Sequence, residues 1–208
     1  MRIGVVSDTH DRGEAVGEAV RLLLEQHVEL LLHCGDIESV ETVRLFRPIP
    51  THFVFGNWDK DRTKLAAAIK DAGGTHHESF GAIELAGKRL AWVHSHERHQ
   101  LRQLEHSDFF DYLFYGHTHV REQHRTGRTL VANPGALFRA NPKTCIVLDV
   151  VTGEIKPIII PSKVLHSPNG TPADEPTGPE TLRPITSIVP PPLPDPVPPD
   201  SEDGPNLA

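Results

Sequence analysis

The sequence predicts an α/β protein whose folded body ends near residue 160. Two observations support this fold class. Between residues 3 and 71, short apolar runs typical of buried strands alternate with segments whose apolar residues recur at helical spacing. Between residues 80 and 160, short apolar runs follow one another and are separated by turns rich in glycine, asparagine and proline. The order of the first region predicts parallel strands joined by right-handed crossovers.

The first half is expected to contain three strands and three helices in strict alternation. The strands are predicted at residues 3–7, 29–33 and 51–55, and the helices at residues 12–26, 38–46 and 61–71. The helix at 12–26 carries its apolar residues at helical spacing. The helix at 61–71 ends before Gly73 and Gly74, residues that commonly terminate helices.

The second half is expected to be rich in strands. They are predicted at residues 80–85, 89–94, 112–115, 120–125, 129–132, 144–150 and 155–160. A single polar helix is expected at 97–106, and hairpin turns at 86–88, 126–128 and 152–153. The simplest arrangement of these elements is a core of two sheets flanked by helices.

The composition changes sharply near residue 161. Fifteen of the 19 prolines lie between residues 157 and 205, whereas 13 of the 14 histidines lie between residues 10 and 124. Five units of the net charge of −7 come from residues 161–208. Such a segment lacks the apolar surface needed to offset the entropy of ordering it. We therefore predict a folded, histidine-rich body at 1–160 and a disordered, acidic, proline-rich tail at 161–208, whose partner the sequence does not identify.

The composition also excludes several classes of protein. No apolar run approaches the roughly 18 residues of a membrane span. The beginning of the chain does not look like a signal peptide, and the two cysteines suggest no disulfide framework, so a cytoplasmic location is expected. The nearly neutral body has no long run of lysine and arginine and therefore no strong nucleic-acid signature. A homo-oligomer remains open, because no interface can be identified from the sequence.

Acidic, amide and imidazole side chains follow five of the predicted strands. One such residue after a strand is usually a helix cap or a turn residue. Five coinciding strand ends indicate a shared site, because the carboxyl ends of parallel strands gather ligands. The candidate ligands are Asp8, His10, Asp36, Asn57, His94, His117 and His119. This donor set suits manganese, iron, cobalt, nickel or zinc, and it is large enough for two ions that share a carboxylate.

These motifs resemble those of the calcineurin-like metallophosphoesterases. The resemblance covers residues 1–160 in order and rests on Asp8-Thr9-His10, Gly35-Asp36, Gly56-Asn57, His94 and Gly116-His117-Thr118-His119. The short body and the Asn133-Pro134-Gly135 turn look most like the small bacterial and archaeal phosphodiesterases. The resemblance implies a four-layer α/β/β/α sandwich with two mixed sheets.

The resemblance further implies how the ligands are shared between two divalent ions, of which manganese is the leading candidate. Asp8, His10 and His119 would hold one ion, and Asn57, His94 and His117 the other. Asp36 would bridge them. The activity implied is hydrolysis of phosphodiesters or small activated phosphate esters, in which a metal-bridging hydroxide attacks phosphorus in line.

One residue departs from the pattern of the family. Many members have a histidine after the Gly-Asn pair, and the small phosphodiesterases often have cysteine, but this chain has Trp58. An indole cannot act as a general acid. His96 is the candidate replacement acid, and Asp59 is a candidate for orienting the ligand imidazoles. If no acid is present, activity should fall steeply as the pKa of the leaving group rises.

Two other functions are compatible with parts of the sequence. A non-catalytic protein-binding scaffold on the same fold is favoured by Trp58 and by the proline-rich tail, but disfavoured by the complete ligand set. A dinucleoside-polyphosphate or protein-serine/threonine phosphatase would have histidine after the Gly-Asn pair and a longer chain with recognition insertions.

Overall fold

The computed structural model describes residues 1–161 and 186–187, and it places them in two mixed sheets of six strands each. The first sheet is formed by β1 (Arg2–Val6), β2 (Leu30–His33), β3 (Thr51–Phe53), β4 (Thr75–His76), β10 (Lys143–Asp149) and β11 (Ile155–Ile160). Its spatial order is β11-β10-β1-β2-β3-β4. β1 to β4 are parallel, as the β-α-β alternation predicts, and β10 and β11 are antiparallel to their neighbours.

The second sheet contains strands from the second half of the body and one pair of residues from the tail. It is formed by β5 (Phe80–Leu85), β6 (Lys88–Val93), β7 (Tyr112–Tyr115), β8 (Glu122–Thr126), β9 (Thr129–Asn133) and β12 (Thr186–Ser187). Its spatial order is β12-β5-β6-β7-β9-β8, and β6, β7 and β9 are parallel. The predicted hairpin at 86–88 is confirmed: Ala86 and Gly87 both have positive φ, as a two-residue hairpin turn requires.

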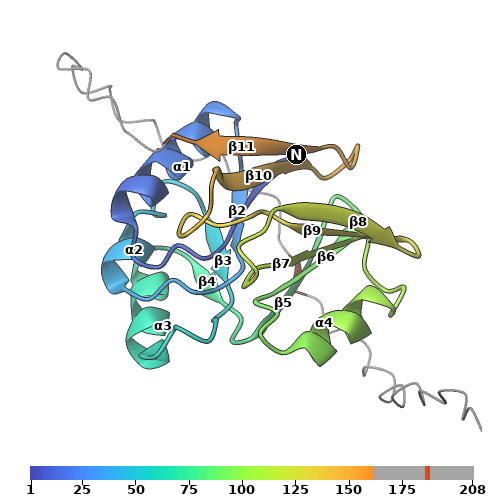
Figure 1. Ribbon diagram of the computed structural model, residues 1–208, viewed down its shortest axis with the longest axis horizontal. Coiled ribbons are helices and arrows are strands. Elements are labelled where there is room, and N and C mark those ends of the chain that lie inside the picture. Colours follow the sequence, from blue (N-terminus) through green and yellow to red (C-terminus); the bar gives the residue numbers. More distant parts are fainter. Residues whose placement is uncertain (162–185, 188–208) are drawn as a thin grey trace, which may run out of the picture.

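Helices cover the outer face of each sheet. Figure 1 shows α1 (Gly13–Glu25), α2 (Val40–Arg44) and α3 (Arg62–Asp71) on the first sheet and α4 (Arg98–Glu105) on the second. One apolar cluster fills the space between the first three helices and their sheet, another lies between the two sheets, and a third lies under α4. The predicted four-layer α/β/β/α sandwich is therefore confirmed.

The central strands are apolar throughout because both of their faces are buried. On β1, Ile3 and Val5 belong to the cluster between the sheets, whereas Val6 belongs to the cluster under the helices. Successive side chains of a strand point to opposite faces, so a strand covered on both sides needs an uninterrupted apolar run. The same arrangement recurs on β2, where Leu31 faces the helices and its neighbours on either side face the second sheet.

Two short strands were not predicted. β4 has two residues and follows the glycines that end α3, so it carries no periodic signal. β12 lies within the predicted tail and pairs antiparallel with β5, with Thr186 opposite Glu84. At these two residues the chain is paired with the second sheet, and the disorder expected for 161–208 stays a prediction. The rest of the tail, beyond residue 161, lies outside the described residues, and the boundary at 160 stays a prediction.

The described part of the chain contains no helix that is long and apolar enough to cross a membrane. Cys34 and Cys145 are both buried and unpaired. The cytoplasmic location and the homo-oligomer stay predictions.

Gly17 offers a test of the helical layer. It lies inside α1, where glycine costs about 1 kcal/mol relative to alanine, and a Cβ added there meets no atom within 4 Å. Gly17→Ala should therefore raise the free energy of unfolding by about 0.5–1 kcal/mol in urea titrations. An unchanged or lowered value would show that this part of α1 is not packed as described.

Candidate metal centre

The loops that follow five strands meet at one edge of the sandwich. β1, β2 and β3 are parallel neighbours in the first sheet, and β6 and β7 are parallel neighbours in the second. Their carboxyl ends bring the predicted ligands together from both sheets. All seven side chains belong to one connected cluster of contacts: Asp8, His10, Asp36, Asn57, His94, His117 and His119.

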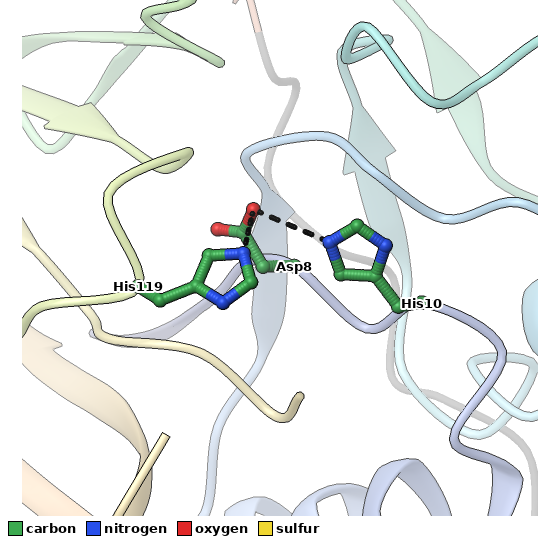
Figure 2. Close-up of side chains that lie close together, drawn as sticks. All are labelled: Asp8, His10 and His119. Atoms are coloured by element: carbon green, nitrogen blue, oxygen red, sulfur yellow. Dashed lines mark ion pairs between the residues drawn. The ribbon is translucent and has the colours of Figure 1, made fainter. Parts of the chain in front are cut away.

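Asp8 is the centre of the first half of this cluster. The carboxylate is fully buried, and its Oδ1 lies 3.2 Å from Nε2 of His119 and 3.8 Å from Nε2 of His10. Figure 2 shows the two imidazoles directed at this one oxygen from two sides. The three side chains form a group whose donor atoms all lie within 4.8 Å of one another, which is the geometry of a candidate metal site.

Asp36 is the centre of the second half. Its Oδ2 lies 3.1 Å from Nε2 of His94 and 3.5 Å from Nε2 of His10, so it faces both halves of the cluster. Nε2 of His94 also lies 3.0 Å from Oδ1 of Asn57, and the ring of His117 is centred 5.1 Å from that of His94. A second group of close donor atoms contains Asp8, Asp36 and His94.

A close approach of the two sheets holds the two halves together. The backbone N–H of His117, from the second sheet, donates to Oδ2 of Asp8 at 3.0 Å. The preceding residue must be Gly116, because a Cβ at this position would lie 1.9 Å from Oγ of Ser7. Asn133, at the end of β9, donates from Nδ2 to the carbonyl of Gly116 and to the hydroxyl of Thr118. This polar residue therefore positions the loop that carries His117 and His119.

The backbone at the ligands is held in a conformation that most residues avoid. Positive φ angles occur at five of the seven ligands: Asp8 at 53°, His10 at 42°, Asp36 at 58°, His117 at 73° and His119 at 60°. Such backbone strain costs energy at each residue and is concentrated in proteins at functional sites. Here it directs side chains from alternate loop positions into one small volume.

Asp59 has a different role from the one the sequence suggested. Each of its buried carboxylate oxygens accepts two backbone N–H groups, those of Asp36 and Gly56 on one oxygen and those of Ile37 and Glu38 on the other. All of these hydrogen bonds go to the backbone, and none goes to an imidazole. Asp59 is thus a positioning residue that fixes the loops bearing Asp36 and Asn57.

His33 joins the Asp8 loop to the Asp36 loop. It is fully buried, its Nδ1 accepts the N–H of Gly35, and its Nε2 lies 3.2 Å from the hydroxyl of Thr9. That hydroxyl donates to the carbonyl of Asp36 at 3.1 Å. Burial lowers the pKa of His33 to about 3, so its imidazole is neutral and its tautomer is fixed by these two bonds.

The imidazoles themselves are oriented by groups that sequence reasoning missed. Nδ1 of His10 lies 2.7 Å from Oε1 of Glu38, and Nδ1 of His94 lies 2.8 Å from the carbonyl of Cys34. In both residues Nε2 is thereby left directed at the cluster, as a metal-binding histidine requires. Glu38 follows Asp36 at the alternate spacing seen in the other loops, and this spacing was the available signal.

The electrostatics of the cluster favour positive charge between the carboxylates. Burial would lower the pKa of His94, but its hydrogen bond to Asp36 and the charge of Asp8 outweigh burial and raise it. The close contact with the Asp8 carboxylate and its negative charge likewise raise the pKa of His119. Burial would raise the pKa of Asp36, yet the hydrogen bond from His94 lowers it. Burial and the charge of His94 lower the pKa of both His96 and His117.

The donor atoms of the cluster fit divalent metal ions. Oδ1 of Asp8 and Nε2 of His10 are buried and make no hydrogen bond, although unpaired buried polar atoms are costly. Two buried carboxylates, four imidazoles and one amide are the mixed oxygen and nitrogen donors that late first-row metals prefer. A cation bound among them would satisfy the unpaired atoms and offset the buried negative charge.

The cluster opens into a cavity of about 290 Å³. Four of the residues that line it are predicted ligands, Trp58 is the residue that departs from the family pattern, and the other three were not predicted as part of the site. The residues that line it are His10, Asp36, Glu38, Trp58, His117, His119, Phe138 and Arg139. His96 lies beside the cluster, with its ring centred 5.6 Å from that of His94 and its Nδ1 buried without a hydrogen bond.

This fold and site define the chain as a phosphoesterase of the calcineurin type. The family model of the calcineurin-like phosphoesterase superfamily domain matches residues 1–153, and the chain belongs to this superfamily. The predicted family, fold and enzyme class, a phosphoric ester hydrolase, are therefore confirmed.

Proteins similar to the chain in sequence or in fold come from archaea, bacteria and eukaryotes. It is 29% identical to phosphodiesterase MJ0936 of Methanocaldococcus jannaschii over 165 residues, which cover 77% of this chain and 99% of the relative. A solved structure of an archaeal phosphodiesterase matches with a TM-score of 0.73 and 29% identity, covering 77% of this chain and 100% of that chain.

More distant structures share the fold alone. The phosphoesterase Yfce from E. coli is 20% identical with a TM-score of 0.54, and the match covers 77% of this chain and 100% of Yfce. Vps29 from Entamoeba histolytica, solved in complex with zinc, is 19% identical with a TM-score of 0.54, covering 77% and 98% of the two chains.

The positioning role of Asp59 can be tested with a matched pair of substitutions. Asp59→Asn replaces an oxygen acceptor by an amide donor that faces backbone N–H groups, so it should lower the free energy of unfolding by about 2 kcal/mol or more. Asp61→Asn is the control, because Asp61 is an exposed N-cap of α3 and asparagine caps equally well. Equal unfolding free energies for the two variants in denaturant titrations would refute the role.

Proposed function

We propose that the chain is a phosphodiesterase that uses two divalent metal ions, with manganese as the leading candidate and iron, zinc, nickel or cobalt as alternatives. The observation that carries the proposal is the gathering of seven donor side chains into one cluster around the buried carboxylates of Asp8 and Asp36. Similarity to an archaeal phosphodiesterase along 77% of the chain supports diesters as the substrate class.

The contacts support the division of the ligands into two sets. Asp8, His10 and His119 form one group, and the pairs of His94 with Asp36 and Asn57 form the core of the other. Asp36 faces His10 as well as His94, which suits a carboxylate shared by two ions. Asn57 is neutral, so the set that contains it would leave more positive charge for the substrate phosphate.

The residues of the chain would prepare the site for hydrolysis in two ways, by orienting the metal-binding imidazoles and by supplying a proton to the leaving group. Glu38 and the carbonyl of Cys34 hold the imidazoles in the orientation that binds metal. When bound, two such ions would lower the pKa of a water molecule and neutralise the phosphoryl oxygens, which favours in-line attack on phosphorus. His96, next to the cluster, would protonate the leaving oxygen, a task for which Trp58 has no titratable group.

The scaffold hypothesis accounts less well for the geometry. A surface that only binds proteins does not need buried, unpaired donors such as Oδ1 of Asp8 and Nε2 of His10, nor strained backbone at five ligands. The cytoplasm is the proposed location, consistent with two buried free cysteines.

The function can be tested by assaying bis(4-nitrophenyl) phosphate with the manganese-loaded full chain. We expect metal-dependent turnover, which His94→Ala should reduce at least about a hundredfold because it removes a ligand. His99→Ala is the matched control, since His99 is exposed on α4. The proposal fails if the wild-type protein hydrolyses no phosphate ester with any of the five metals, or if the two variants are equally active.

The role of His96 can be tested with a series of aryl diesters whose leaving groups differ in pKa. Loss of a general acid harms poor leaving groups most. In His96→Asn, log kcat should therefore fall more steeply with leaving-group pKa than in the wild type, whereas His99→Asn should leave the slope unchanged. Parallel plots for His96→Asn and the wild type would assign protonation to another group.

A further inference from the structure

We propose that Trp58 is a binding surface for a planar aromatic substituent of the phosphate ester, so that the site selects diesters carrying an aryl ring or a nucleobase over alkyl diesters. This inference rests on the proposed phosphodiesterase function and names its substrate class. Aryl rings and nucleobases share the chemistry that matters here, a flat π-system attached through an ester to a phosphate.

The first observation is the position of Trp58. It directly follows Asn57, and its backbone N–H donates to Oδ1 of Asp36 at 2.9 Å. The backbone of Trp58 is thus fixed against a buried part of the site, where Asp36 is 1% exposed. The residue as a whole is nevertheless 56% exposed and lines the cavity. Packing in the core does not explain a large apolar side chain in this place.

The second observation is how the indole is held. Nζ of Lys60 lies 5.7 Å from the centre of the Trp58 ring and also donates to the carbonyl of Asn57 at 2.7 Å. The edge-on imidazole of His10 is centred 6.2 Å from the indole. These contacts on a short loop leave much of the ring open while they restrict its position. A ring positioned in advance loses little entropy when a substrate stacks on it.

The third observation is the composition of the wall beyond His10. Phe138 has its ring centred 4.8 Å from that of His10, and the guanidinium groups of Arg12 and Arg139 lie 4.5 and 4.9 Å from the Phe138 ring. Phe138 is therefore in contact with two cations, whereas Trp58 has one cation at 5.7 Å and stays 56% exposed. The cavity thus combines a polar floor for a phosphate, an open aromatic surface and cationic groups near its rim.

The geometry fits a diester rather than a bare phosphate. A phosphoryl group bound at the predicted ligands would lie among His10, Asp36 and His119. The centre of the indole ring lies 6.2 Å from the centre of the His10 imidazole. A substituent on the phosphorus that points toward this wall meets a π-surface before it meets solvent. Stacking of a base on an aromatic side chain commonly changes affinity about tenfold or more.

The test compares three ligands as competitive inhibitors of bis(4-nitrophenyl) phosphate hydrolysis by the manganese-loaded full chain. Diphenyl phosphate carries aryl rings, thymidylyl-thymidine carries nucleobases, and dibutyl phosphate carries only alkyl groups. In Trp58→Leu the inhibition constants of one or both aromatic ligands should rise about tenfold, and that of dibutyl phosphate less than twofold. Trp58→Phe should restore most of the affinity. Val151→Ala, which shortens an exposed apolar side chain in the turn between β10 and β11, is the control.

The two aromatic ligands distinguish the source of the ring. A change confined to diphenyl phosphate indicates an aryl ester, and a change confined to the dinucleotide indicates a nucleobase. An equal rise for all three ligands, or no rise in Trp58→Leu, overturns the proposal.

Fluorescence gives a readout that does not require turnover. The chain has two tryptophans, and Trp92 is fully buried between the sheets. Diphenyl phosphate or thymidylyl-thymidine should quench the exposed Trp58 in the wild type but not the emission of Trp58→Phe, whereas dibutyl phosphate should quench neither. Quenching in a protein without activity would uphold the aromatic surface while the proposed hydrolysis fails. Turnover without quenching would uphold the proposed hydrolysis while the aromatic surface fails.

Discussion

The site depends on the burial of two carboxylates, Asp8 and Asp36, within a few ångströms of each other. Buried negative charges are costly unless cations or hydrogen-bond donors surround them. The protein supplies backbone N–H groups from His117 and Trp58 and imidazoles from both sheets, yet Oδ1 of Asp8 makes no hydrogen bond. The remaining charge favours bound cations, and the raised pKa of His94 reflects the same field.

The fold provides this arrangement by placing the carboxyl ends of parallel strands from two sheets at one edge. The connections between the loops are as important as the ligands. Asp59 gathers four backbone N–H groups, and neutral His33 links the Asp8 loop to the Asp36 loop. Gly116 permits the sheets to approach. These interactions offset the strain of the backbone at the predicted ligands, so a variant at any of them should disturb both groups of donor side chains.

The layers of the fold and the candidate ligands can be predicted from the sequence. Strands buried on both faces are apolar, and the candidate ligands follow the ends of such strands. The remaining features depend on contacts that have no local pattern. β4 and β12 have only two residues each, too few for periodicity. The role of Asp59 depends on the direction of backbone N–H groups, which residue types do not encode. Phe138 and Arg139 reach the cavity from a loop with no motif.

The central claim is that the buried carboxylates hold two divalent ions in each chain. Native mass spectrometry of the full chain, loaded with manganese and exchanged into metal-free volatile buffer, counts them directly. The account predicts a dominant species with two manganese ions per chain. A protein that retains one ion or none under conditions where it remains folded would contradict the dinuclear site.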